Sequence, residues 1–282
     1  MTAKTATPAP TVVYKTVGER KLTLEMSYPG DWRPGDKRPA IVFFFGGGWA
    51  NGTLEQFRPQ AEYFAKRGMV CARADYRVRS RDGVSPDKCV EDAISAMRWI
   101  RANAATLGVD PNRIVSSGGS AGGHLAACAY FTEGLHASTD DLSISPKPNA
   151  MVLYNPALDF LSFSRELLDK HGCGMNNETL ERLSPTRHLR KDIAPTLIID
   201  GTKDFLYNQI HEFDSKAKAM GAPVEAYYVE DKPHGFFNLS PWLENTTQRV
   251  DDFLQAIGFL KSSPKADLPK RDKPFRAVEK GK

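Results

Sequence analysis

The fold of this chain is decided by one stretch, Ile114-Val115-Ser116-Ser117-Gly118-Gly119-Ser120-Ala121-Gly122-Gly123-His124-Leu125-Ala126-Ala127-Cys128. It begins as a short apolar, β-prone run after the turn residues 108–112. It then breaks into glycines around one serine and continues as a run of small residues rich in alanine. Glycines between an apolar run and a helix-forming run mark a tight connection. The stretch therefore predicts a strand, a sharp turn and a helix.

Within this stretch, Gly118-x-Ser120-x-Gly122 is the pattern of a nucleophile elbow, a serine held on a tight turn between a strand and a helix. A side chain at either glycine would strike a neighbouring element. The first amides of the helix, beginning at Ala121, favour anionic charge beside the serine. A flexible Gly/Ser loop or an ordinary helix start is the other interpretation, and the flanking strand and helix favour the elbow.

The length and composition of the chain indicate a globular α/β protein. Its 282 residues suffice for one large domain or two small ones, and no stretch has the composition of a linker. Charged residues make up 26% and apolar residues 41%, an ordinary globular balance. No apolar run reaches the length of about 18 residues that a membrane span needs, so we expect no membrane partner. The net charge of +4 lies largely in residues 261–282, so we expect no nucleic-acid partner.

The two ends of the chain are expected to lie outside the domain. Residues 1–10 are rich in Thr, Ala and Pro and lack the apolar core of a secretory signal, so we expect a flexible tail. As written, the sequence indicates a cytoplasmic protein, or a secreted or periplasmic one if a signal has been removed. Residues 261–282 mix basic residues with prolines and are expected to form a basic, disordered tail. The oligomeric state stays open.

The four cysteines have neither metal-binding nor C-x-x-C spacing. Cys71 falls in a predicted strand, Cys89 and Cys128 fall in predicted helices, and Cys173 falls in a glycine-flanked loop. We expect structural, buried thiols. Neither a metal nor a cofactor is expected.

Strands and helices alternate between the two tails. Residues 11–28 alternate apolar and polar positions around Gly18-Glu19-Arg20 and predict two antiparallel strands. The later apolar runs predict strands at 40–45, 69–74, 113–115, 151–154, 195–200 and 224–229, and the helical spacings predict helices at 55–67, 86–108 and 209–220 and one after Ser120. This alternation predicts a mostly parallel central sheet with helices on both faces.

A serine hydroxyl needs a base within hydrogen-bonding reach, and the base needs an acid that fixes its tautomer. Asp204 and His234 each lie just past a predicted strand, where loops meet at one edge of a parallel sheet. Taken singly, they would be an ordinary turn aspartate and a surface histidine. The order Ser120, Asp204, His234 predicts a nucleophile, an acid and a base. Asp200 is the rival acid, although we expect it to lie within the strand.

The remaining histidines have no comparable position after a strand. His124 lies on the helix after Ser120 and is expected to pack beneath or beside the sheet. We assign no role to any of the five, which are His124, His136, His171, His188 and His211.

The glycines that follow the predicted strand 40–45 have no side chain to block close approach to their backbone N–H groups. We expect the amides of Gly47, Gly48 and Ala121 to form an oxyanion hole, in which each donor is worth about 3 kcal/mol of transition-state stabilisation. A plain glycine turn is the simpler interpretation. Trp49 either walls a substrate-binding pocket or anchors the loop as a buried ring, and the sequence does not separate the two.

These residues resemble an α/β-hydrolase, specifically the hormone-sensitive-lipase-like esterases and the related short-chain carbohydrate esterases of the acetyl-xylan and feruloyl types. The likeness runs from about residue 40 to residue 259. It rests on Phe45-Gly46-Gly47-Gly48-Trp49, Asp75-Tyr76-Arg77, Gly118-Gly119-Ser120-Ala121-Gly122-Gly123, Asp204-Phe205-Leu206 and His234-Gly235-Phe236. The resemblance implies an α/β-hydrolase catalytic domain over residues 11–260, with a small cap insertion at 156–194.

The chain departs from that family in two places. The family's glycine loop usually opens with a histidine that helps to hold the loop, whereas this chain has Phe45. The lipase-like members carry a substantial N-terminal lid, whereas here the chain enters the predicted sheet almost at once. Only residues 156–194 are left as a cover, and a thin cover suits small acyl groups or the side chains of a polymer.

The sequence therefore predicts a serine carboxylesterase that hydrolyses short-chain acyl esters of small molecules through an acyl-enzyme. The second candidate within this class is an acetyl esterase that acts on carbohydrate, such as acetylated xylan. A peptidase of the same fold is disfavoured because the large accessory domain of such enzymes is missing. A non-catalytic binding protein is disfavoured because both the nucleophile and the base are present.

Overall fold

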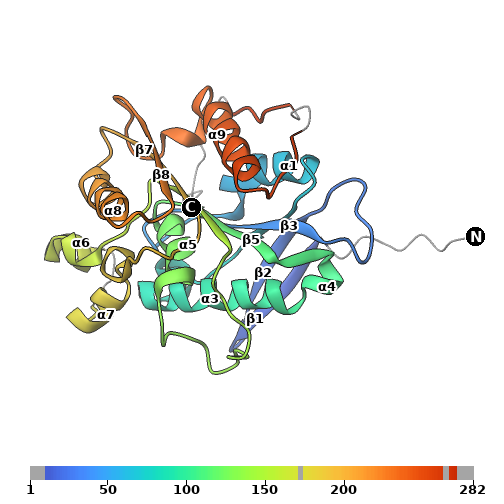
Figure 1. The fold of residues 1–282 in the computed structure, drawn as a ribbon. Coiled ribbons are helices and arrows are strands. Elements are labelled where there is room, and N and C mark those ends of the chain that lie inside the picture. Colours follow the sequence, from blue (N-terminus) through green and yellow to red (C-terminus); the bar gives the residue numbers. More distant parts are fainter. Residues whose placement is uncertain (1–9, 171–173, 263–266, 272–282) are drawn as a thin grey trace, which may run out of the picture.

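The computed structural model describes residues 10–170, 174–262 and 267–271 (Figure 1). The predictions for residues 1–9, for His171 and for Cys173 fall outside the described residues. No helix in the described part of the chain is long and apolar enough to cross a membrane.

The described residues form one eight-stranded sheet in the order β1-β2-β4-β3-β5-β6-β7-β8. β2 is antiparallel to both of its neighbours, and all other pairs are parallel. The predicted N-terminal hairpin and mostly parallel sheet are thus confirmed. The strands are β1 (Thr11–Val17), β2 (Arg20–Ser27), β3 (Arg38–Phe44), β4 (Val70–Ala74), β5 (Val109–Gly119), β6 (Ala150–Tyr154), β7 (Thr196–Gly201) and β8 (Val224–Val229).

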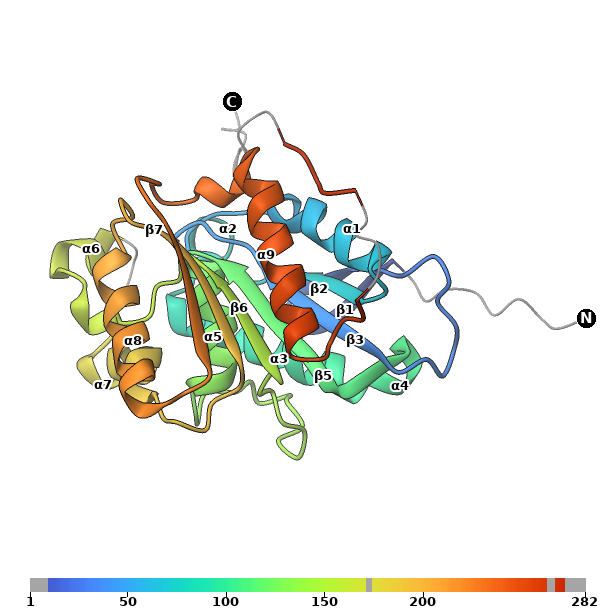
Figure 2. The same cartoon turned by 45° about the horizontal axis from the view of Figure 1, so that its top comes forward.

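Helices cover both faces of this sheet (Figure 2). One face packs against α3 (Pro86–Ala102), α5 (Ala121–Phe131) and α8 (Tyr207–Met220), and the other packs against α1 (Arg58–Lys66) and α9 (Trp242–Ala256). On α3, buried apolar residues occur at the i, i+3, i+4 and i+7 spacing of an amphipathic helix, and they include Val90, Ala93, Ile94, Met97 and Ile100. The sheet is therefore buried on both sides, which explains the continuous apolar character of its central strands.

Burial of the cysteine thiols is confirmed for Cys71, Cys89 and Cys128. Burial raises the pKa of the Cys128 thiol to about 12, and the pKa of the other two thiols is raised as well, chiefly by burial. These three thiols are therefore protonated and unreactive at neutral pH.

Several elements differ from their predicted bounds. The predicted helix 86–108 is broken at Asn103 into α3 and α4 (Ala104–Leu107), and the amide side chain of Asn103 bonds the carbonyl oxygen of Trp99. Residues 109–112, expected in a turn, extend β5 because Val109 pairs with Arg38 on β3. The predicted helix 55–67 starts as η1 (Leu54–Phe57) before α1. Neither α2 (Arg79–Asp82) nor α9 was predicted.

The segment expected to be a small cap lies between β6 and β7 and contains short helices. These are η2 (Phe160–Ser162), α6 (Arg165–Lys170), α7 (Asn177–Arg182) and η3 (Pro185–His188). α6 and α7 lie beside α8 (Figures 1 and 2). Phe160, Leu180 and Leu183 are buried in the same apolar cluster as α5. The segment thus packs down onto the domain and brings apolar side chains close to the ends of the strands.

Residues 267–271, within the expected C-terminal tail, lie against the domain. Leu268 packs on the apolar cluster of α1 and α9. The Arg271 amide donates to the Ser240 hydroxyl at 3.1 Å, and the Arg271 guanidinium donates to the carbonyl oxygen of Glu55 at 2.8 Å. This part of the chain therefore connects the loop after β8 with η1.

Candidate active site

Ser120 lies on the turn between β5 and α5, with φ 56° and ψ −119°. A positive φ is uncommon for a residue other than glycine and indicates backbone strain that the surroundings must hold. A Cβ atom on Gly118 would come within 2.3 Å of the Gly122 carbonyl oxygen, and one on Gly122 within 2.1 Å of the Phe44 carbonyl oxygen. The expected steric need for both glycines is confirmed. The elbow is closely packed between β3 and α5.

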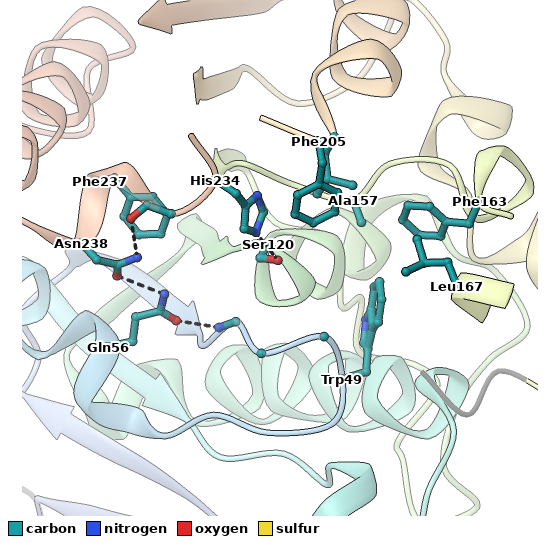
Figure 3. Close-up of a pocket in the computed structure, with 15 residues that line it drawn as sticks. Trp49, Gln56, Ser120, Ala157, Phe163, Leu167, Phe205, His234, Phe237 and Asn238 are labelled. Carbon is teal, nitrogen blue, oxygen red and sulfur yellow. Dashed lines mark hydrogen bonds between the residues drawn. The ribbon is translucent and has the colours of Figure 1, made fainter. Parts of the chain in front are cut away.

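The structure brings the three predicted side chains together at the ends of their strands. Figure 3 shows the imidazole of His234 beside Ser120. The Ser120 hydroxyl lies 2.8 Å from Nε2 of His234. Nδ1 of His234 lies 2.7 Å and 2.9 Å from the two carboxylate oxygens of Asp204. With Nδ1 donating to the carboxylate, Nε2 is free of its proton and accepts from the serine. This is the tautomer that a general base needs.

The two candidate acids, Asp200 and Asp204, have different contacts. Asp204 is buried beyond the end of β7, and its Oδ1 also accepts the Leu206 amide proton at 2.8 Å. Asp200 lies within β7, as expected, and accepts the Asn155 side-chain amide at 2.5 Å. The Asn155 side-chain oxygen in turn accepts the Gly235 amide at 3.2 Å. Asp204 therefore contacts the imidazole of His234, whereas Asp200 supports the backbone beside it.

The Asp200 carboxyl is an unusual group to find within a strand. It is fully buried, and its Oδ2 has no hydrogen-bond partner among the described residues. Burial, and then the nearby charge of Asp204, raise the pKa of Asp200 to about 8. Asp200 therefore carries a proton at neutral pH and adds no second negative charge beside Asp204.

The glycine loop, residues 46–48, follows β3 and has backbone angles that residues with a side chain rarely adopt. Gly47 has φ 135° and Gly48 has φ 60°, and a Cβ atom on Gly47 would come within 2.2 Å of the Asn51 carbonyl oxygen. Both glycines line the same cavity as Ser120, and Ala121 begins α5 directly after it. The three residues expected to form the oxyanion hole are thus grouped around the serine.

Phe45, which stands where the related esterases usually have histidine, holds this loop in another way. Its ring stacks on Tyr76, with ring centroids 4.1 Å apart, and the Tyr76 hydroxyl donates to the Phe45 carbonyl oxygen at 2.6 Å. Both residues are buried. The tyrosine of the Asp75-Tyr76-Arg77 motif therefore fixes the start of the glycine loop by stacking and by a hydrogen bond.

Two amide side chains that sequence reasoning missed connect the glycine loop to the histidine loop. Gln56 Oε1 accepts the Gly46 amide at 2.6 Å, and Gln56 Nε2 donates to Asn238 Oδ1 at 3.1 Å. The Asn238 side chain donates in turn to the Gly235 carbonyl oxygen at 2.9 Å. Both side chains line the cavity (Figure 3). Neither belongs to a recognisable motif, so the sequence carries no signal for them.

The cavity beside Ser120 has a volume of about 330 Å³. Figure 3 shows Trp49, Phe163 and Leu167 on one side of the serine and Gln56 and Asn238 on the other. We call these the apolar end and the polar end. Above them, Phe205 is 69% exposed, and its ring lies 4.6 Å from that of His234. The apolar end is thus built from the loop after β3 and from the segment between β6 and β7.

Trp49 combines the two uses between which the sequence did not decide. Its ring lines the cavity, yet the residue is only 5% exposed. Its indole N–H donates to Nδ1 of His124 at 3.1 Å. His124 is fully buried on α5, as expected for a packed histidine, but it also has a specific partner on the cavity wall.

The other described histidines lie outside this site, and they are His136, His188 and His211. Within the described part of the chain, no group of three or more His, Cys, Asp or Glu residues is arranged to hold a metal ion. The nucleophilic and acid–base groups that meet beside the cavity are the hydroxyl, imidazole and carboxylate already described.

Comparison with known proteins identifies the family of the chain. The chain matches the BD-FAE family over residues 31–216, more than half of its length. It is similar to Esterase LipQ of Mycobacterium tuberculosis, with 24% identity over 262 residues that cover 85% of this chain and 60% of LipQ. This chain therefore spans less than two thirds of the length of that curated relative.

Solved structures give a more complete overlap. The chain is 43% identical to a thermophilic esterase of Thermogutta terrifontis solved with propionate bound, with a TM-score of 0.83, covering 90% of this chain and 96% of that one. It is 44% identical to Thermogutta terrifontis esterase 2 phosphorylated by paraoxon, with a TM-score of 0.84, covering 92% of this chain and 98% of that one. The family match and the shared architecture lead to one conclusion: the chain belongs to the BD-FAE family and has the α/β-hydrolase fold.

Proposed function

We propose that this protein is a serine carboxylesterase that hydrolyses short-chain acyl esters through an acyl-enzyme. The observation that carries the proposal is the continuous hydrogen-bond chain from the Ser120 hydroxyl through His234 to Asp204, at the floor of a cavity rimmed by the glycine loop. The esterase names and titles of the similar proteins support the same activity.

In the proposed mechanism, Ser120 Oγ attacks the ester carbonyl carbon while its proton passes to Nε2 of His234. Asp204 stabilises the imidazolium that forms. The amides of Gly47, Gly48 and Ala121 stabilise the oxyanion of the tetrahedral intermediate. His234 then donates the proton to the departing alcohol oxygen, and the same groups activate a water that hydrolyses the acyl-enzyme.

The limited size of the cavity supports short acyl groups. Its volume is about 330 Å³, and bulky side chains close the apolar end, namely Trp49, Phe163 and Leu167. A long acyl chain would have to displace one of these side chains or leave the cavity. We therefore expect the rate to fall from butanoyl toward octanoyl esters.

An acetyl esterase acting on carbohydrate, such as acetylated xylan, is the second candidate, and one observation favours it. A second groove of about 320 Å³ adjoins the cavity and shares Phe163, Leu167 and Phe205 with it. Its other lining residues are Ser162, Ser164, Asn208, Gln209 and Glu212. A groove lined by hydroxyl, amide and carboxylate groups beside an exposed aromatic ring suits an alcohol that carries further hydroxyl groups.

The test is a panel of nitrophenyl esters from acetyl to octanoyl, together with acetylated xylan, given to the protein and to Ser120→Ala. We expect the alanine variant to lose at least about 10³-fold in kcat/KM on every substrate. Paraoxon should add a phosphoryl group to Ser120, detected by mass spectrometry, as the Thermogutta terrifontis esterase is described as phosphorylated by it. An Ser120→Ala variant that retains activity would refute the serine mechanism.

A further inference from the structure

The imidazole of His124 lies between the wall of the cavity and the segment that covers it. His124 is fully buried on α5, and its backbone amide bonds the Ser120 carbonyl oxygen at 3.0 Å. On one side of the ring, Nδ1 lies 3.1 Å from the indole nitrogen of Trp49. On the other side, Nε2 lies 2.8 Å from the carbonyl oxygen of Leu183. One side chain therefore links α5, the loop after β3 and the segment between β6 and β7.

The partners of His124 fix its protonation state. An indole N–H only donates, and a carbonyl oxygen only accepts. Nδ1 must therefore carry a lone pair, and Nε2 must carry the proton that goes to Leu183. Burial lowers the pKa of His124 to about 4, so the ring is neutral at neutral pH, as this arrangement requires.

Aromatic packing holds the same group of side chains together. The ring of Phe160 lies 4.8 Å from that of Trp49 and 4.7 Å from that of His124, and Phe163 lies 6.5 Å from Trp49. The hydrogen bond to His124 adds a preference for one orientation of the indole, because a buried indole N–H that lacks a partner is unfavourable.

We propose that His124 is a positioning residue that sets the depth of the apolar end of the cavity by holding Trp49, and thereby sets the acyl-chain preference of the enzyme. This inference rests on the proposed esterase function. When the tether is lost, the indole turns to find another partner, the apolar end deepens, and longer acyl groups gain access. The hydrogen bonds of Ser120, His234 and Asp204 do not pass through His124, so the chemical step itself continues.

Nε2 also lies 3.2 Å from the Cys128 sulfur, and two substitutions separate the hydrogen bond at Nδ1 from the contacts at Nε2. The side-chain oxygen of asparagine matches the place of Nδ1, so His124→Asn keeps an acceptor for Trp49. The longer glutamine places its amide nitrogen near the site of Nε2, so His124→Gln keeps a donor for Leu183 but not the acceptor for Trp49. The measurement is the ratio of kcat/KM for hexanoyl and acetyl nitrophenyl esters, with the KM and kcat of each ester recorded separately.

We expect His124→Asn to keep this ratio within about twofold of the unsubstituted enzyme. We expect His124→Gln to raise it roughly fivefold, through a lower KM for the hexanoyl ester, since a neutral hydrogen bond is worth about a factor of that size. A general loss of packing would lower kcat for both esters and leave their ratio unchanged. Thermal unfolding of each variant identifies any that does not fold.

Trp49→Phe provides an independent test from the other end of the bond, because it removes the N–H and keeps an aromatic ring. It should shift the ratio in the same direction, and adding His124→Gln to it should produce no further shift. An unchanged ratio in folded His124→Gln or in folded Trp49→Phe would overturn the inference. An unsubstituted enzyme that cleaves no ester would instead overturn the proposed function, so the two failures are distinct.

Discussion

The polar and apolar ends of the cavity are each held by a chain of hydrogen bonds, but the two chains connect different parts of the molecule. At the polar end, Gln56 and Asn238 connect the glycine loop to the histidine loop. In the proposed reaction, every ester meets both loops. At the apolar end, His124 connects Trp49 to Leu183, and in the proposed reaction only the acyl group meets that wall. Damage at the polar end should therefore slow all substrates alike, whereas damage at the apolar end should change which substrates are preferred.

One catalytic group, Ser120 with His234 and Asp204, is proposed to lie between the two ends. Asp204→Asn tests this and should have the largest effect. Asparagine cannot stabilise the imidazolium and presents the wrong group to Nδ1 of His234. We expect kcat to fall by about 10⁴-fold, by analogy with the serine protease triad. Because neither end is touched, the preference across acyl lengths should not change, which steady-state kinetics on two ester lengths will check.

Asp200→Asn is the matched control, because it makes the same chemical change four residues earlier, on the strand that leads into the Asp204 loop. We expect its activity at pH 7 to stay within about threefold of the unsubstituted enzyme, since Asp200 contacts Asn155 and not the imidazole. The opposite result, with a severe loss in Asp200→Asn and a mild one in Asp204→Asn, would reassign the acid.

Gln56→Leu tests the polar end and should have the next largest effect. It removes the acceptor for the Gly46 amide and the donor for Asn238, so the glycine loop loses its fixed distance from His234. A displacement of about 1 Å in such a site lowers rates by up to about 10²-fold, and we expect a loss of about 10- to 100-fold. The loss should be equal for acetyl and hexanoyl esters.

Gln56→Glu retains the acceptor for Gly46 and should lose less activity than Gln56→Leu. Gln248→Leu, on α9 and away from the cavity, is the control for the substitution itself. If Gln56→Leu changed the acyl preference instead of the overall rate, the contrast between the two ends would be wrong.

The sequence predicted the chemical centre better than the parts that hold it. Ser120, Asp204 and His234 were predictable because each follows an apolar strand, and parallel strands bring their ends to one edge. Gln56, Asn238 and His124 were not predictable, since their partners lie up to 182 positions away and are backbone groups or other side chains without a motif. For His124, a position on a buried helix face indicated packing but not a partner.

The strands and helices were predicted to a similar extent, and the errors in their bounds have similar causes. Alternating and apolar runs identified the strands, because a strand buried on both faces leaves a local pattern. The break at Asn103 and the extension of β5 to Val109 depend on capping contacts and on pairing with β3, which a local pattern does not record. Tertiary contacts thus decided the boundaries, while local pattern decided the elements.

Tyr76→Phe tests the common support of both ends and should have a smaller effect. Phe45 directly precedes the three glycines, and Trp49 directly follows them. The position of Phe45 therefore affects both the glycine loop and the apolar end of the cavity. The variant keeps the ring stack and loses the hydrogen bond to the Phe45 carbonyl oxygen. We expect the free energy of unfolding to fall by about 1 kcal/mol, or about 2–4 °C in melting temperature, with a few-fold loss of activity. A change in acyl preference larger than the loss of rate would show that Phe45 serves only the apolar end.

Asp200→Asn should have the smallest effect on rate, but it carries a clear effect of pH on stability. The carboxyl has a pKa of about 8 in the folded protein and an ordinary value of 3.8 when exposed. Between these two pH values the carboxyl of Asp200 is protonated in the folded state and ionised in the unfolded state, so the free energy of unfolding falls as the pH rises toward 8. The stabilisation from this proton is complete only below about pH 4. Asparagine resembles the protonated carboxyl and does not titrate. The melting temperature of Asp200→Asn should therefore rise relative to the unsubstituted protein between pH 5 and pH 9, since only the unsubstituted protein must either keep the proton or bury a second charge beside Asp204. If the difference in melting temperature between the two proteins stayed constant from pH 5 to pH 9, Asp200 would be ionised already at low pH. The site would then have to tolerate two neighbouring negative charges.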